Sequence, residues 1–131
     1  MKDGIVISSG CFNLNNTFNN GQCFRWERLD EHSYGGVACG RFLKIIQEDN
    51  GVRLLNSSQA DYENTWKNYF DLETDYEAVE NSLRTDAIME TAVDAGHGMR
   101  ILRQELWEVL ISFIISQNNN ISRIKKIVNN I

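Results

Sequence analysis

The pattern of hydrophobic and polar positions changes character near Asn56. Before this residue, β-branched and aromatic residues occur in short runs separated by turn-forming residues, which is typical of strands. We expect strands within residues 4–10, 22–29, 34–40, 42–49 and 52–56. Asn50-Gly51 separates the last two runs and predicts a hairpin, because both residue types tolerate positive φ. Residues 14–20 predict a short helix beside this small antiparallel sheet.

After Asn56 the apolar positions follow a helical period. Aromatic residues recur three and four positions apart within residues 57–72, which predicts an amphipathic helix with an aromatic stripe: Tyr62, Trp66, Tyr69 and Phe70. The sequence TDYE fits a capping box and predicts a helix that starts at Thr74. Thr85 is a candidate cap for a third helix, which Gly96 would end.

The most apolar segment, residues 104–116, has hydrophobic side chains on almost every face. This pattern predicts a central buried helix. Three consecutive asparagines, Asn118 to Asn120, follow it, and an apolar stripe then predicts another amphipathic helix from Ile121. Two such helices would need further packing partners, so we expect the helical part of the chain to look unfinished.

The composition is typical of a globular protein rather than of a membrane-spanning or secreted one. A hydrophobic content of 42% is typical of globular proteins, and no apolar run approaches the length of a membrane span or of a signal peptide. Three cysteines without a paired spacing, Cys11, Cys23 and Cys39, suggest free thiols in a reducing compartment rather than disulfides or a zinc site. We therefore expect a cytoplasmic protein.

The net charge of −5 is unevenly distributed. Residues 57–99 carry two basic and ten acidic side chains, whereas residues 100–131 carry five basic and two acidic ones. A polyanion could approach the basic C-terminal part while the acidic middle faces water. The distribution permits nucleic-acid binding without requiring it.

The asparagine tip has a structural and a functional interpretation. Asn120 directly precedes the apolar stripe of the last helix and is a good candidate for its N-cap. Asn118 and Asn119 could simply form a polar turn. They also lie at the positive end of the helix dipole with Arg123 one turn further on, an arrangement suited to a phosphate or a base edge.

The sequence NNGQCFRW at residues 19–26 is the second unusual segment. Gly21 would open a strand with Phe24 and Trp26 on one face and Arg25 on the other. The structural interpretation is a turn before an aromatic core strand. The functional one is a glycine that lets a flat ligand approach the backbone closely.

No arrangement of residues indicates catalysis. His32 and His97 lack catalytic or metal-binding spacing, and Lys125 and Lys126 are typical of a solvated helix face. We expect no catalytic residue, no metal site and no cofactor in this chain.

Several segments in this order resemble one family. They are NNGQCFRW, YFDLETDY at residues 69–76, and RILRQELWEVLISFIISQNNNISRIKKI at residues 100–127. Together they resemble the N-terminal part of the 8-oxoguanine DNA glycosylases of the helix-hairpin-helix superfamily, of the bacterial, clostridial-like type. The resemblance implies an α+β fold: a twisted antiparallel sheet with helices, as in the TATA-binding protein, over residues 1–99. Residues 100–131 would begin a helical domain.

The resemblance also implies roles for individual residues. Asn118 would enter the duplex where the damaged base has been extruded and contact the orphaned cytosine, with Asn119 beside it on the DNA and Arg123 bonding the same cytosine. The carbonyl of Gly21 would accept a hydrogen bond from N7–H of 8-oxoguanine, a hydrogen that guanine lacks. The implied partner is double-stranded DNA with 8-oxoguanine opposite cytosine, and the full-length protein would act as a monomer without a membrane.

The implied activity is that of a DNA N-glycosylase with AP lyase activity in base-excision repair. Its lysine nucleophile and its aspartate match no residue of this sequence, so we expect the chain alone to be inactive. Two alternatives stay open: a non-catalytic module that binds DNA or protein, and a scaffold whose exposed helix faces bind another chain.

Overall fold

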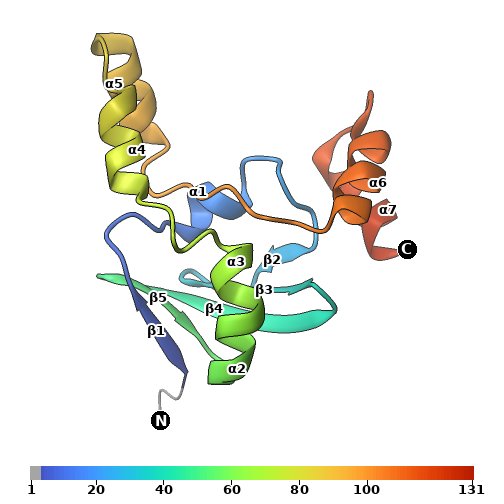
Figure 1. Ribbon diagram of the computed structural model, residues 1–131. Coiled ribbons are helices and arrows are strands. Elements are labelled where there is room, and N and C mark those ends of the chain that lie inside the picture. Colours follow the sequence, from blue (N-terminus) through green and yellow to red (C-terminus); the bar gives the residue numbers. More distant parts are fainter. Residues whose placement is uncertain (1–3) are drawn as a thin grey trace.

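The computed structural model describes residues 4–131 and has five strands in one antiparallel sheet, in the order β1-β5-β4-β3-β2. The strands are β1 (Ile5–Ser8), β2 (Trp26–Arg28), β3 (Ser33–Ala38), β4 (Arg41–Glu48) and β5 (Gly51–Leu54). Helix α1 (Leu14–Phe18) lies between β1 and β2, and the other helices follow β5 (Figure 1). The predicted α+β class is confirmed.

The β4–β5 hairpin forms where the sequence predicts it, but its turn differs. Glu48 pairs with Gly51, so Asp49 and Asn50 are the two loop residues and Asn50-Gly51 is not the central pair. Gly51 lies within β5 with φ of +144°, and a Cβ there would lie 2.0 Å from the carbonyl oxygen of Ile7. Glycine is therefore required by the close approach of β1 rather than by the turn.

The β3–β4 hairpin is the one with positive φ at both loop positions. Ala38 pairs with Arg41, and the two residues between them, Cys39 and Gly40, have φ of 51° and 68°. Such a pair is the signature of a type I′ turn, whose twist matches that of the flanking strands.

The aromatic stripe after β5 packs on one face of the sheet. It is carried by a continuous helical segment: α2 (Gln59–Asp61), a π-helical turn η1 (Tyr62–Trp66) and α3 (Lys67–Tyr69). Ser58 caps it through a capping box with Asp61. Trp66, Tyr69 and Phe70 are buried against Phe12, Phe18 and Trp26, and the indole Nε1 of Trp26 donates to the Tyr69 hydroxyl at 2.9 Å. The predicted stripe is confirmed as the centre of the core.

Strand β2 is shorter than the sequence predicts, because residues 22–25 are not in the sheet. Trp26 packs in the main core, whereas Phe24 packs with Ile124 and Val128 in a second cluster. The prediction that Phe24 and Trp26 share one strand face is wrong. An irregular backbone before Trp26 directs the two rings toward different helices.

Helices α4 (Tyr76–Leu83) and α5 (Ala87–Ala95) form as predicted, but the N-cap of each lies one residue after the predicted one. Asp75 accepts a hydrogen bond from the Ala78 amide, and Asp86 accepts from the amides of Ile88 and Met89. Aspartate replaces threonine as the cap in both cases, because its carboxylate also interacts favourably with the positive end of the helix dipole. Gly96 ends α5 as predicted.

Helix α6 (Leu106–Ser116) differs most from the sequence-based expectation. None of its residues is buried, and Leu106, Trp107 and Phe113 are 83%, 71% and 63% exposed. Within residues 4–131 it packs mainly against α7 (Ile121–Asn129). The hydrophobic pattern correctly predicts a helix, but the prediction of a buried one is wrong for this chain.

An extended segment, residues 99–105, joins the pair α4–α5 to the pair α6–α7, which lie on opposite sides of the molecule (Figure 1). Arg100 anchors it and is only 4% exposed. Its guanidinium lies over the rings of Phe12 and Tyr76, at 5.0 and 4.6 Å from their centroids, and Nη1 donates to the Asp71 carbonyl oxygen at 3.0 Å.

The Asp71 side chain holds the same segment. Its carboxylate accepts hydrogen bonds from the Tyr76 hydroxyl and from Arg103 Nε, both at 2.9 Å. Burial opposes its ionisation, but the hydrogen bonds from Tyr76, Arg103 and Thr74 outweigh this and hold the pKa of Asp71 below its ordinary value of 3.8.

We expect this carboxylate to make stability depend on pH in the acidic range. Because the folded pKa is lowered, its contribution is complete above pH 3.8 and is lost as the pH falls through the folded pKa. Asp71→Asn should therefore flatten the acid limb of a urea-unfolding profile, whereas Asp49→Asn, at an exposed turn position, should leave it unchanged. An unaltered acid limb in Asp71→Asn would contradict this assignment.

Candidate nucleic-acid interface

The asparagine tip joins α6 to α7 at the end of this helical pair that points away from the sheet (Figure 1). Asn120 caps α7 as predicted, with its side-chain oxygen 3.0 Å from the Arg123 amide nitrogen. Asn119 is also used locally, because its Nδ2 donates to the Ile115 carbonyl oxygen at 3.1 Å and its Oδ1 accepts from the Asn120 amide. Two of the three asparagines therefore shape the tip.

Asn118 differs from its two neighbours. It is exposed and adopts a left-handed backbone with φ of 50°, a conformation that asparagine tolerates better than most residues. Among residues 4–131, no hydrogen bond holds its side-chain amide. Arg123 is exposed on the first turn of α7. The tip thus presents one amide and one guanidinium beside the positive end of a helix dipole.

Gly21 lies in the loop between α1 and β2. It is exposed, has φ of +85°, and a Cβ added there would meet no atom within 4 Å. The backbone around this glycine is thus open to a ligand, while the positive φ disfavours any residue with a side chain.

Contacts on either side of Gly21 attach its loop to the helical pair. Phe24 is buried with Ile124 and Val128 of α7. Arg25 Nε donates to Glu108 of α6 at 2.7 Å, and Gln104 Nε2 donates to the Gln22 carbonyl oxygen at 2.6 Å. The structure therefore brings the predicted lesion-contacting loop and the predicted DNA-contacting helices into one unit.

Gln22 is a residue whose role the sequence did not reveal. Its Nε2 donates to the carbonyl oxygens of Thr17 and Arg100, both at 2.8 Å, and its Oε1 accepts from the Leu102 amide at 3.0 Å. One side chain thus joins α1 to the segment that leads into α6. Its partners lie up to 80 residues away, so no local pattern could have identified this role.

Local contacts disfavour the nucleophilic forms of Lys67 and Cys23. Hydrogen bonding and ion pairing with Glu73, together with Glu63, raise the pKa of Lys67. Burial raises the pKa of Cys23 to about 12, and all three cysteines are free, as predicted. No helix of residues 4–131 has the length and apolar character needed to cross a membrane.

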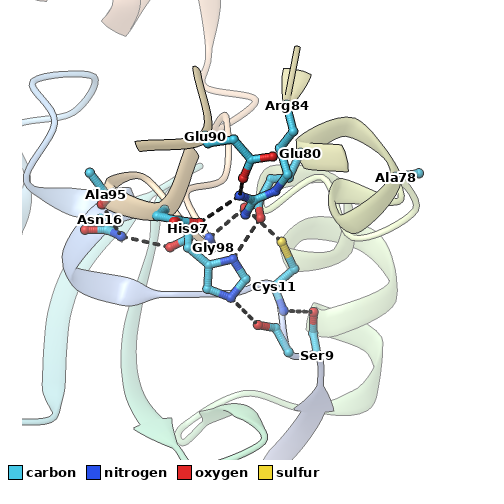
Figure 2. A network of polar contacts seen from close by, with 12 residues as sticks. Ser9, Cys11, Asn16, Ala78, Glu80, Arg84, Glu90, Ala95, His97 and Gly98 are labelled. Carbon is cyan, nitrogen blue, oxygen red and sulfur yellow. Dashed lines mark hydrogen bonds and ion pairs between the residues drawn. The ribbon is translucent and has the colours of Figure 1, made fainter. Parts of the chain in front are cut away.

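One group of possible metal ligands lies outside this interface. Cys11, Glu80 and His97 come together beside the base of the α4–α5 pair (Figure 2). No sequence motif indicates this group, because Cys11 and His97 are 86 positions apart.

Comparison with known proteins identifies the family. Residues 4–110 match the family described as 8-oxoguanine DNA glycosylase, N-terminal domain. The chain belongs to this family. The resemblance noted from the motifs and the α+β fold class that it implied are confirmed. The division of the chain at residues 99 and 100 stays a prediction.

Curated relatives agree. The N-glycosylase/DNA lyase of Saccharomyces cerevisiae is 32% identical over 97% of this chain and 37% of its own length. The N-glycosylase/DNA lyase OGG1 of Arabidopsis thaliana is 30% identical over 86% of this chain and 32% of its own. The chain spans about a third of the length of these curated relatives.

Solved structures are similar as well. The 8-oxoguanine glycosylase/lyase of Clostridium acetobutylicum, in complex with double-stranded DNA containing cytosine opposite 8-oxoguanine, has a TM-score of 0.90 and 36% identity, over 100% of this chain and 48% of that one. MBOgg1, in complex with a low-affinity DNA ligand, has a TM-score of 0.88 and 40% identity, over 98% and 47%.

Proposed function

We propose that this chain forms the lesion-recognition part of a DNA glycosylase/AP lyase that removes 8-oxoguanine opposite cytosine in base-excision repair. The observation that carries the proposal is the exposed tip, where the unpaired amide of Asn118 lies next to a helix N-terminus bearing Arg123. Family membership supports it, and so does the DNA bound to the clostridial relative, which has the same lesion and the same opposite base.

In this proposal Asn118 and Arg123 hydrogen-bond the cytosine left unpaired when the lesion is extruded. Cytosine presents the acceptors N3 and O2 and the donor N4, a mixture that an amide and a guanidinium can match. These contacts offset part of the few kcal/mol lost when a base leaves the stack. Asn119 is hydrogen-bonded to Ile115 and Asn120 and sets the shape of the tip. In this proposal it contacts DNA only at the edge of the tip.

Gly21 is proposed to supply the carbonyl that distinguishes the lesion. 8-Oxoguanine has a hydrogen on N7 where guanine has a lone pair, so one backbone acceptor favours the lesion and repels the normal base. A mismatched buried polar group costs about 1–3 kcal/mol, which is enough for useful discrimination.

Substitution at the tip tests this function directly. Asn118→Ala and Arg123→Ala should each weaken binding to an 8-oxoguanine·cytosine duplex by about 1–3 kcal/mol, roughly 5- to 150-fold, measured by fluorescence anisotropy. Asn129→Ala and Lys126→Ala are matched controls, since both residues are exposed on the same helix. The asparagine control should change nothing, and the lysine control should weaken damaged and undamaged DNA equally.

The outcomes separate the proposal from its alternatives. If Asn118→Ala binds like the unaltered chain, the tip does not contact the orphaned cytosine. If Arg123→Ala and Lys126→Ala weaken binding to both duplexes equally, Arg123 contributes only its positive charge and does not contact the cytosine. Borohydride treatment of the damaged duplex with this chain should trap no covalent adduct. A trapped adduct would show that an amine of these 131 residues does the chemistry, with Lys125 or Lys126 as the first candidates.

A protein-binding module is the second candidate, favoured by the exposed apolar face of α6 with Leu106, Trp107 and Phe113. A protein-binding module would show no preference for damaged over undamaged DNA. Tip substitutions without effect on DNA binding would support it over the repair function.

A further inference from the structure

A second polar site lies beside the base of the α4–α5 pair (Figure 2), and this pair lies on the other side of the molecule from α6–α7 (Figure 1). Cys11 follows β1, Glu80 belongs to α4, and His97 follows α5. The Cys11 Sγ lies 3.1 Å from Glu80 Oε1, and His97 Nδ1 lies 2.8 Å from Glu80 Oε2. One ligand-type atom from each side chain lies within 4.8 Å of the others.

Backbone contacts fix the orientation of two of these groups. The Gly98 amide donates to Glu80 Oε1 at 2.8 Å, which positions the carboxylate. The Nε2 of His97 lies 3.1 Å from the Gly10 carbonyl oxygen. A carbonyl can only accept, so Nε2 carries a hydrogen and Nδ1 is the nitrogen that faces the cluster.

This second contact is the one that metal-binding histidines usually make. A ligating imidazole almost always donates its other N–H to a carbonyl or a carboxylate, which fixes the ring and the tautomer. A neutral His97 held in this way would present a lone pair on Nδ1 toward Cys11 and Glu80 (Figure 2).

We propose that Cys11 Sγ, the Glu80 carboxylate and His97 Nδ1 form a binding site for a zinc-class divalent cation, with water as a fourth ligand. Thiolate, imidazole and carboxylate are all zinc ligands, and the thiolate selects against Mg²⁺ and Ca²⁺. The site is open on one side, because the His97 side chain is 54% exposed while Cys11 is buried.

The charges balance when the ion binds. The Cys11 thiol gives up its proton to solvent as the Zn–S bond forms, and His97 binds through Nδ1 with its hydrogen on Nε2. One thiolate and one carboxylate together then offset the two positive charges of Zn²⁺. Two basic groups lie near the cluster: Arg84, which is paired with Glu90 and Asp94, and Arg100, whose positive charge acts on Cys11.

Side-chain rotation has to bring the ligand atoms to tetrahedral spacing. Tetrahedral zinc with bonds of about 2.0–2.3 Å places neighbouring ligand atoms roughly 3.3–3.6 Å apart. Cys11 Sγ lies 3.1 Å from Glu80 Oε1 and His97 Nδ1 lies 2.8 Å from Glu80 Oε2, so these two contacts would open by about 0.5 Å. The two contacts involve different carboxylate oxygens, so a carboxylate that binds through one oxygen would also have to turn.

Cobalt titration of the chelator-treated chain tests the site. Co²⁺ should bind one per chain and give the near-ultraviolet charge-transfer absorption of a cobalt–thiolate bond, and Zn²⁺ should abolish this band. Cys11→Ser should remove the band, and His97→Gln should weaken binding by more than about 100-fold, beyond the usual effect of losing an outer-shell partner. Bound Zn²⁺ should also raise the Tm of the unaltered chain.

Matched controls come from the other cysteines and the other histidine. Cys39→Ser removes an exposed thiol and His32→Gln an exposed imidazole, and both should leave the titration unchanged. If Cys11→Ser fails to fold, the cobalt titration of His97→Gln still tests the proposal, because His97 lies at the exposed side of the site. A titration without a thiolate band, or one with equal affinity in His97→Gln, would overturn the proposal. Neither result bears on DNA binding, which depends on other residues.

Discussion

Phe70→Ala is expected to lower the free energy of unfolding by about 3–5 kcal/mol, the range for removing a buried aromatic ring. Phe70 is fully buried, and its ring centroid lies 5.0 Å from that of Tyr69 and 5.4 Å from that of Phe12. Trp26 and Trp66 lie on its other sides, each at 6.0 Å. The cavity would open where the helical segment meets the sheet, so little can collapse into it.

Urea unfolding followed by tryptophan fluorescence measures this loss, with Phe42→Ala as the matched control. Phe42 is 56% exposed on β4, and its removal should change stability by no more than about 0.5 kcal/mol. A loss below about 1 kcal/mol in Phe70→Ala would show that the aromatic cluster repacks and is not the centre of stability.

Gln22→Ala is expected to lower the free energy of unfolding by about 2–4 kcal/mol. It should also loosen the segment 99–105 locally. It removes three hydrogen bonds at once, leaving the carbonyl oxygens of Thr17 and Arg100 and the Leu102 amide without this partner. Each buried polar group left unpaired costs about 1–3 kcal/mol, and water entering the gap recovers part of the sum.

Hydrogen exchange distinguishes this effect from a general loss of stability. The Leu102 amide should exchange faster in Gln22→Ala by more than the global destabilisation explains, because the segment 99–105 is freed from α1. Gln59→Ala is the control, since the Gln59 amide makes only an exposed contact with Glu63. Unchanged protection at Leu102 would mean that the other contacts of the segment, among them those of Asp71, Arg100 and Gln104, anchor it without the Gln22 side chain.

The motifs identified the family correctly, yet several details needed coordinates. The sequence predicts a strand over residues 22–29, but only Trp26–Arg28 are in the sheet. The deviation is what allows Phe24 to reach α7 while Gly21 stays open. The roles of Asn118, Asn119, Arg123 and Gly21 on DNA remain predictions, and the structure adds that Asn119 is already engaged within the tip.

The helix N-caps also show which details local sequence predicts and which depend on the rest of the fold. Asn120 was correctly predicted as a cap because it directly precedes an apolar helical stripe. The predicted caps Thr74 and Thr85 each lie one residue before the observed cap, because each threonine is followed by an aspartate that can also cap a helix. Sequence periodicity locates a helix, but the competition between adjacent caps depends on the path by which the chain enters it.

The sequence by itself determined the features that depend on near neighbours: the five strands, the aromatic stripe, the asparagine cap and the motifs of the glycosylase family. Tertiary structure alone decided that Arg100 is buried, that α6 is exposed in this chain, and that Cys11, Glu80 and His97 meet. The reason is physical. Backbone periodicity and capping act within about four residues along the chain. Burial and ligand clusters instead depend on which distant segments the sheet and its connections bring together.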